Sequence, residues 1–314
     1  MASTCCWPFF AAMLLAATPV AAQEPLPTTA GKPWTHAHSG IVIPAALDEL
    51  PRVRATSFAA PELDISQNFA SGDGRESLTV YIFRDTNGAV PVWFAQAVRA
   101  IALREDLKAP PYGIAPVAFS PPGQPVASGL KAVFAPVGVE GVRSTGVALF
   151  AVGGWYVKLR ANSATLAPGD LSDWMEGVLG ELTLPRGAPA AAVQPVADCG
   201  PGLHFQAATV DASPAATVPA PRLAAARWCL DSVVAGNQAV YRPDGARDRY
   251  LLAAGDNGKG FSVQPQAGHY AIDFVTPAQT FLMAAQDGMP TPQRVLDLAK
   301  AGRSTGAVAT WPKP

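Results

Sequence analysis

The sequence predicts an α+β protein with two small domains, each an antiparallel sheet with one or two packed helices. Three observations support this fold class. Strand-like segments are followed in each half by a segment with helical spacing of apolar residues. The chain has 314 residues, which is longer than a single hydrophobic core usually supports. An Ala/Pro-rich stretch without periodicity, residues 186–198, separates the halves. We therefore expect domains at 34–185 and 199–314.

Residues 1–22 predict a signal peptide. An apolar run over residues 9–17 is followed by small residues that suit cleavage after Ala22, although no basic residue precedes the run and the first is Lys32. A membrane anchor is the alternative, but such a span needs roughly 20 apolar residues. Cleavage predicts a periplasmic or secreted bacterial protein without a further membrane span. It also leaves residues 23–33 as a disordered, Pro-rich lead.

The first half contains a clear series of elements. Residues 63–69 alternate between apolar and polar, and residues 77–84 are rich in β-branched and aromatic side chains, so both segments predict strands. Pro91 suits the first turn of a helix, and the apolar spacing after it predicts a helix over 91–107.

A hairpin and a second helix follow. The strands are expected at 145–152 and 155–160, because Gly153-Gly154 tolerates the positive φ angles of a two-residue turn. Apolar residues from Leu171 onward recur at helical intervals, which predicts an amphipathic helix over 170–182.

The hairpin Val147–Arg160 and the helix Asp170–Leu182 resemble the PsbP/Mog1-type α/β sandwich. The resemblance covers about 34–185. This half is also similar to an uncharacterised family of exported bacterial proteins. Neither resemblance implies a catalytic set of residues.

The second half predicts a β-rich domain that ends in a helix. Short strands are expected at 238–242, 249–254, 261–264, 269–275 and 279–285, separated by turns rich in Asp, Gly, Asn and Pro. Thr291 is the expected N-cap of the last helix, Pro292 its first residue, and Gly302 the residue just after its end.

Two cysteines, Cys199 and Cys229, remain after removal of the signal peptide, which contains Cys5 and Cys6. An even number in an exported chain predicts a disulfide, and two separate buried thiols are the alternative.

Composition argues against several functions. Lys and Arg number 23 and Asp and Glu 24, so the net charge of -1 provides no positive field for nucleic acid. The nucleotide-binding glycine motifs are absent from the sequence, and we predict no cofactor.

His36 and His38 are candidates for a metal site. In an extended chain two residues at i and i+2 share a face, so two imidazoles could bind zinc or copper. A site needs at least one more ligand, and none is near in the sequence. Two surface histidines are the alternative interpretation.

A Ser–His–Asp hydrolase is a second possibility. His269 and Asp273 share one strand at i and i+4, and His204 is the other remaining histidine. The sequence has no Gly-x-Ser-x-Gly elbow. We therefore expect a non-catalytic exported binding or accessory protein that holds an envelope protein or a small ligand. A periplasmic hydrolase using His269 or His204, and metal binding through His36 and His38, are the alternatives.

Overall fold

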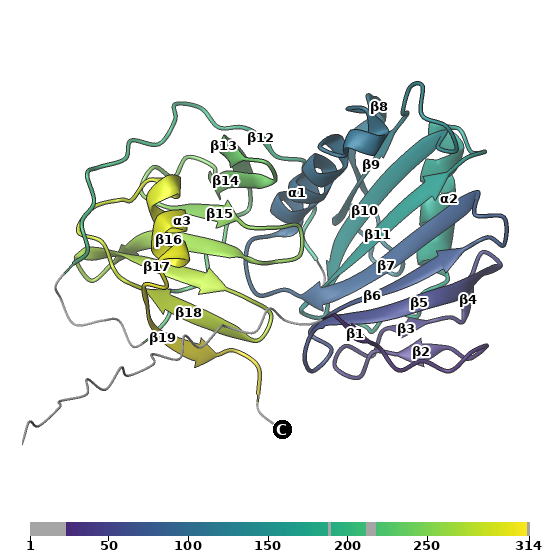
Figure 1. Cartoon of the computed structure of the whole chain (residues 1–314), viewed down its shortest axis with the longest axis horizontal. Helices are drawn as coiled ribbons and strands as arrows, with labels where there is room; N and C mark the ends of the chain where they lie inside the picture. Colours follow the sequence, from purple (N-terminus) through teal and green to yellow (C-terminus); the bar gives the residue numbers. More distant parts are fainter. Residues whose placement is uncertain (1–22, 188–189, 212–217, 313–314) are drawn as a thin grey trace, which may run out of the picture.

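The structure, a computed structural model, describes residues 23–187, 190–211 and 218–312. The predicted signal peptide at 1–22 lies outside them. Two large, mainly antiparallel sheets dominate the molecule (Figure 1): of the described residues 40% are in strands and 13% in helices. The expected α+β class is therefore wrong, because the chain is mostly β and does not balance sheets with packed helices in each domain.

The first sheet is antiparallel and has the spatial order β1-β5-β6-β7-β11-β10-β9-β8, with β4 paired to β5. Its strands are β1 Glu24–Pro25, β4 Ala46–Leu47, β5 Leu50–Ala59, β6 Asp64–Ala70, β7 Glu76–Arg84, β8 Tyr112–Phe119, β9 Gly129–Phe134, β10 Ser144–Val152 and β11 Trp155–Ser163. A separate pair consists of β2 Trp34–Thr35 and β3 Val42–Ile43. β1 lies inside the segment expected to be a disordered lead.

Two helices pack on opposite faces of this sheet. α1, Val90–Ala102, and α2, Pro168–Gly180, both contact β9 and β10. The alternation of β10 explains the arrangement, since Val147 and Leu149 belong to the α1 core whereas Ala148 and Phe150 belong to the α2 core. This strand is therefore apolar on both faces.

The expected hairpin is confirmed: β10 and β11 pair directly, and Gly153 and Gly154 have φ angles of 58° and 82°. The first helix is shorter than the expected 91–107, because α1 ends at Ala102 and the chain continues into a 3-10 turn at Glu105–Leu107.

The second sheet follows chain order from β12 to β19 and carries α3, Pro292–Lys300. Thr291 caps α3 by accepting a hydrogen bond from the Arg294 amide at 3.2 Å, and Gly302 has φ 65°. The cap and the five expected strands are confirmed. The strands are β12 Ala197–Asp198, β13 Trp228–Ala235, β14 Gln238–Pro243, β15 Tyr250–Ala253, β16 Gly260–Gln266, β17 His269–Val275, β18 Gln279–Met283 and β19 Ser304–Ala309.

Several strands were not predicted because their side-chain alternation is broken. β5, β8 and β13 all contain register shifts against their partners. A bulge adds one residue to a strand, so the period-2 pattern changes face part-way along. These strands raise the sheet content above the expectation.

α1 lies between the two sheets (Figure 1). Its residues Phe94 and Val98 share one core with Tyr241 and Leu251 of the second sheet. Gln96 of α1 accepts a hydrogen bond from Tyr241 Oη at 2.8 Å, so the contact is polar as well as apolar.

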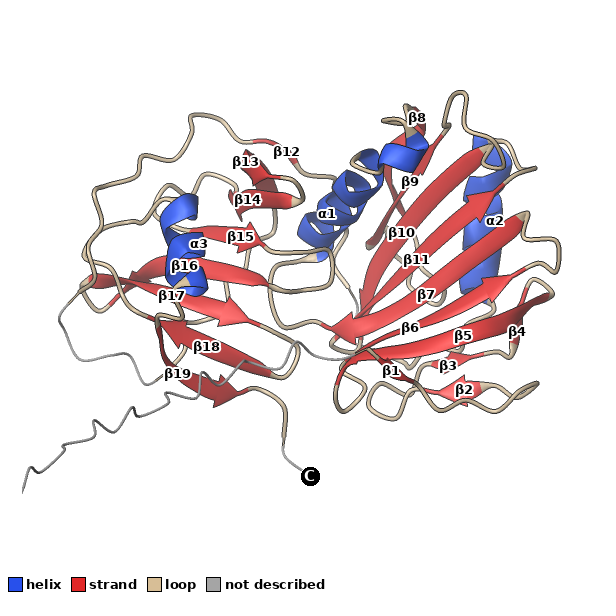
Figure 2. Ribbon diagram, in the orientation of Figure 1, coloured by secondary structure: helices blue, strands red, loops and turns tan. Residues whose placement is uncertain are grey.

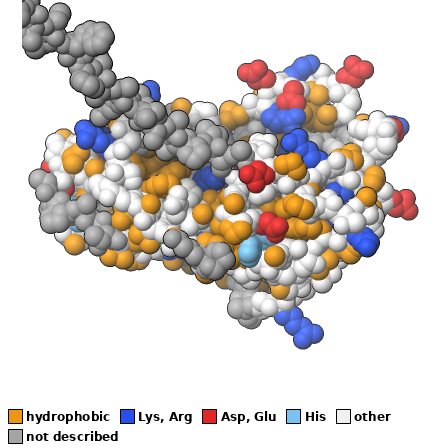
Figure 3. Space-filling view, turned by 60° about the horizontal axis from the view of Figure 1, so that its bottom comes forward, with side chains coloured by type: hydrophobic (Ala, Val, Ile, Leu, Met, Phe, Trp, Pro, Cys, Tyr) orange, Lys and Arg blue, Asp and Glu red, His pale blue; other side chains and the backbone are white. Residues whose placement is uncertain are grey.

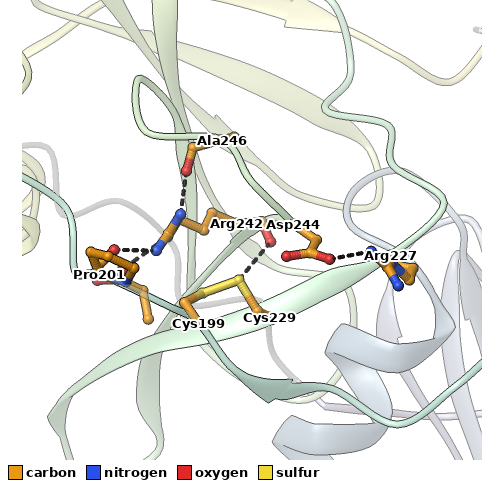
Figure 4. Close-up of a disulfide and its surroundings, with 8 residues drawn as sticks. Cys199, Pro201, Arg227, Cys229, Arg242, Asp244 and Ala246 are labelled. Atoms are coloured by element: carbon orange, nitrogen blue, oxygen red, sulfur yellow. Dashed lines mark hydrogen bonds and ion pairs between the residues drawn. A yellow bond between two sulfur atoms is a disulfide. The ribbon is translucent and has the colours of Figure 1, made fainter.

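The predicted Cys199–Cys229 disulfide is present and joins the chain just after β12 to β13 (Figure 4). The Cys199 amide also donates to the carbonyl of Leu230 at 2.8 Å. Arg242 of the neighbouring strand β14 donates to the carbonyl of Pro201 at 2.7 Å. The disulfide and these hydrogen bonds thus hold residues 199–201 against strands β13 and β14.

Among the helices of the described ranges, none is long and apolar enough to cross a membrane. Over the face seen in Figure 3, hydrophobic side chains form several patches, and positive and negative side chains are interspersed. This face has no broad region of a single charge, in line with the net charge of -1.

Candidate binding cleft between the sheets

A small cleft opens where the two sheets meet. The first half contributes Arg84, the last residue of β7, and the following residues 85–87. The second half contributes residues 219–222, the strands β16–β18 and Thr310. Its volume is about 260 Å³. This is just below the roughly 300–1,000 Å³ typical of small-molecule sites, so the cleft suits only a small ligand.

Asp273 is the buried acid of the cleft. It lies in the middle of β17, directly opposite Ser262 of β16, and only 4% of its surface is exposed. Its carboxylate accepts a hydrogen bond from the Ala220 amide at 2.7 Å, but forms no ion pair with any described residue. Burial raises the pKa of Asp273 to about 6, although the Ala220 hydrogen bond opposes this shift. The cleft therefore contains a carboxylate without a counter-ion.

Other polar groups that line the cleft have unused hydrogen-bonding capacity. Ser262 Oγ donates to Asn87 Oδ1 at 3.2 Å. Asn87 Oδ1 also accepts a hydrogen bond from the Gly88 amide at 2.9 Å. In contrast, Asn87 Nδ2 and Thr86 Oγ1 are buried and have no hydrogen-bond partner among the described residues. Buried polar groups without partners are uncommon in folded proteins, so each calls for an explanation such as a bound water, an ion or a ligand.

Two arginines frame the cleft, but both are engaged elsewhere. Arg222 forms an ion pair with Asp85 and donates to the Gly88 carbonyl at 2.7 Å. Arg84 donates to the carbonyls of Pro277 at 2.5 Å and Thr310 at 3.0 Å. These contacts hold the two halves of the cleft together and leave Asp273 without a cation.

Two buried side chains hold the loop that carries Asn87. The backbone carbonyl of Asn87 accepts hydrogen bonds from Trp93 Nε1 at 2.6 Å and from Tyr156 Oη at 3.4 Å. Gly88, next in the chain, has φ 63°, and a Cβ there would lie 2.8 Å from Trp93 Nε1. A glycine is needed because both the backbone conformation and the close tryptophan exclude a side chain.

The hydrolase candidates are not gathered in this cleft. Asp273 lies in it, whereas His269 lies at the start of β17, opposite Gln266, and His204 is exposed. Four residues of a strand span about 13 Å, which is too far for a hydrogen bond between His269 and Asp273. His269 Nε2 is buried without a partner, so no described Ser or Asp binds it there.

The metal candidates His36 and His38 lie beside Trp155 and Trp311. His36 is buried, and its Nε2 donates to the Glu62 carbonyl at 2.8 Å, so Nδ1 accepts from Ser39 Oγ at 2.7 Å. Burial is the main cause that lowers the pKa of His36, with the neighbouring His38 contributing.

The neutral His36 ring has no free lone pair, and His38 Nε2 donates to the Pro61 carbonyl at 2.7 Å. A metal ion on this pair would have to displace the Ser39 hydroxyl. Within the described ranges, no three His, Cys, Asp or Glu side chains are grouped so that they could hold a metal ion.

Thr86, Asn87 and Ser262 were not singled out from the sequence. Residues 85–88 have the composition of an ordinary turn, and Ser262 is one polar residue in a short strand. A usable signal exists in β16 and β17, where Ser262, Gln264 and Asp273 are polar yet buried.

Comparisons with protein-family models, curated proteins and solved structures find no match to this chain. The resemblance to the PsbP/Mog1-type sandwich thus stays a prediction.

Proposed function

We propose that this protein is a non-catalytic exported binding protein that holds a small amine-bearing polar molecule in the cleft, with Asp273 as the counter-ion of the ammonium group. The observation that carries the proposal is the buried Asp273 carboxylate, which has no cationic partner in the cleft. An isolated buried charge is unfavourable unless it is paired. A ligand ammonium group would pair with this carboxylate, so the unfavourable free energy of the unpaired charge would be relieved on binding.

The remaining groups of the cleft support a ligand with further polar atoms. Asn87 Nδ2 is a donor without an acceptor, and Thr86 Oγ1 can donate or accept. The volume of about 260 Å³ limits the ligand to a small molecule. An amine that carries hydroxyl or carboxylate groups matches both the charge of Asp273 and these donors.

The disulfide supports the export part of the proposal. The Cys199–Cys229 bond is consistent with a secreted or extracellular protein, because such bonds persist in oxidising compartments. The bacterial periplasm is the more specific location that we propose.

The test is isothermal titration calorimetry at pH 7.5 with ethanolamine, methylamine and putrescine, each compared with its neutral hydroxyl isostere. We expect at least one amine to bind at least tenfold more tightly than its isostere, and Asp273→Asn to abolish this preference. Asp173→Asn, which changes an exposed aspartate of α2, is the matched control and should retain it. Equal binding of amines and isosteres, or an amine preference that survives in Asp273→Asn, contradicts the proposal.

A further inference from the structure

Polar side chains from four neighbouring strands share one face of the first sheet. In antiparallel strands, residues that lie opposite one another point to the same side. Arg54 of β5, Asn68 of β6, Thr79 of β7 and Arg160 of β11 form one such row. Tyr81 and Lys158 lie opposite each other in the next row. We call these six residues the open face.

None of the helices in the described part of the chain covers the open face. The opposite side of β7 and β11 packs in the α2 core through Val80, Ile82 and Val157. α1 packs on the same side as the open face, but against β9 and β10. In Figure 2 no helix lies in front of β5, β6 and β7. Accordingly Arg54 is exposed and Thr79 and Arg160 are partly exposed, whereas Lys158 is buried beneath its partner Asp256.

Arg160 is a cation without a counter-ion. Its Nη1 donates to Thr145 Oγ1 at 3.2 Å and to the Gly146 carbonyl at 3.0 Å, both of them neutral groups. Its Nε and Nη2 have no partner among the described residues, and no carboxylate of that part of the chain forms an ion pair with it. Burial lowers the pKa of Arg160 to about 10, and the nearby Arg104 charge adds to this. The guanidinium stays charged at neutral pH.

The acids around Arg160 already have partners. Asp106 is paired with Arg104, and Asp256 is paired with Lys158 at 2.6 Å. Arg54 lies three strands away, about 14 Å, and forms no ion pair within the described ranges. The nearby acids are therefore neutralised by other residues, and the charges of Arg160 and Arg54 give this region a net positive charge.

We propose that the open face binds the oxyanion group of a small anionic molecule, a carboxylate or a phosphate, with the Arg160 guanidinium as the primary contact. Two free N–H groups of a planar guanidinium match two oxygens of such a group. The hydroxyls of Thr79, directly opposite Arg160, and of Tyr81 lie on the same face and can donate as well. This site is separate from the cleft of Asp273 and opposite to it in charge, so it does not depend on the function proposed above.

The experiment titrates acetate, citrate and inorganic phosphate into the full chain by calorimetry at constant ionic strength. We expect at least one of these anions to bind, and Arg160→Gln to weaken its binding at least tenfold. Arg160→Lys keeps the charge but loses the planar pair of donors, so we expect only partial binding. Unchanged affinity in Arg160→Gln, or no binding of any of the three anions to the wild type, overturns the proposal.

Four further measurements separate the possible causes. Arg303→Gln removes an exposed arginine of the second half and should bind as the wild type does. Asp273→Asn should lose amine binding and keep anion binding, so the two proposals fail independently. Vesicles that contain phosphatidylglycerol test a membrane source of the phosphate, and binding to vesicles without binding of the free anions overturns the proposal of a small ligand. Thermal unfolding of Arg160→Gln near the wild-type temperature shows that the variant is folded.

Discussion

Lys158 and Asp256 form an ion pair that joins the two sheets. Lys158 Nζ of β11 lies 2.6 Å from Asp256 Oδ2, in the turn between β15 and β16, and also donates to the Asp256 carbonyl at 3.1 Å. The lysine side chain is 3% exposed, and its ammonium lies over the Tyr81 ring at 4.5 Å. Burial acts to raise the pKa of Asp256, but the Lys158 charge and hydrogen bond lower it overall. This contact fixes the relative position of the halves that form the cleft.

Replacement of Lys158 by Met is expected to destabilise the fold. The substitution leaves Asp256 without its partner, and loss of one partner from a buried pair costs about 3–5 kcal/mol. Since Asp256 is one-third exposed, we expect a smaller loss of about 2–3 kcal/mol in the free energy of unfolding. Chemical denaturation at pH 7 measures it.

The pH dependence checks the cause of this loss. The folded pKa of Asp256 lies below its unfolded value, so its stabilising contribution is present above the unfolded pKa of about 3.9 and is lost as pH falls through the folded pKa. The difference between wild type and Lys158→Met should therefore shrink in strong acid. Lys300→Met, at an exposed position of α3, is the control and should unfold as the wild type does. A difference that is constant with pH contradicts the role given to the ion pair.

The carboxylate of Asp273 should make the fold less stable at neutral pH than in mild acid. Its folded pKa of about 6 is above the unfolded value of about 3.9, so the folded state binds the proton more tightly. This group's contribution therefore decreases as pH rises from 4 to 6 and is constant above that, with a total cost of about 3 kcal/mol.

Asp273→Asn should remove that cost. We expect the variant to be more stable than the wild type at pH 7.5, and the advantage to shrink at pH 4.5, as followed by urea denaturation at both pH values. Asp64, whose pKa burial also raises to about 6, titrates in both proteins, so the comparison isolates Asp273. The same stability difference at both pH values would show that Asp273 does not carry an unfavourable charge.

The elements that could be predicted from the sequence are those whose pattern is local. Gly153-Gly154 specifies a tight turn, and the spacing from Leu171 to Leu179 specifies one apolar helix face. Strands β5 and β8 contain bulges that break the alternation, so they read as loops. The predicted class was wrong because the helices have the clearer patterns, whereas strands, several of them irregular, hold 40% of the described residues against 13% for helices.

The cleft was less accessible to sequence analysis. Asp273 can be noticed as an acid inside an apolar strand, but its burial comes from pairing with Ser262 and from the backbone at Ala220. Asn87 and Ser262 are in contact although 175 residues separate them. No local pattern indicates such a contact, because it depends on how two sheets pack around α1.

Reduction of the Cys199–Cys229 disulfide should lower stability. The bond closes a loop with a sequence separation of 30, and a loop of this size restricts the unfolded chain by about 3–4 kcal/mol. Thermal unfolding with and without dithiothreitol measures the effect. The Cys199→Ser/Cys229→Ser variant should unfold like the reduced wild type and should not respond to dithiothreitol. Unfolding that is insensitive to reduction in the wild type contradicts the prediction.

Gly88→Ala should disturb the cleft more than an equivalent change at an open site. Gly88 and Gly31 have similar φ angles of 63° and 68°, but a Cβ at Gly88 would lie 2.8 Å from Trp93 Nε1, whereas nothing lies within 4 Å at Gly31. Both substitutions force alanine into the left-handed region, and only Gly88→Ala adds a clash, which costs about 1–3 kcal/mol. Gly31→Ala is therefore the matched control for backbone strain, and the difference between the two variants in urea denaturation measures the clash.

Because Asn87 Oδ1 accepts from the Gly88 amide and from Ser262, the displaced loop should also weaken amine binding in the cleft. Equal stability of the two variants would mean that Trp93 moves away without cost and that the loop is not held as tightly as its hydrogen bonds indicate.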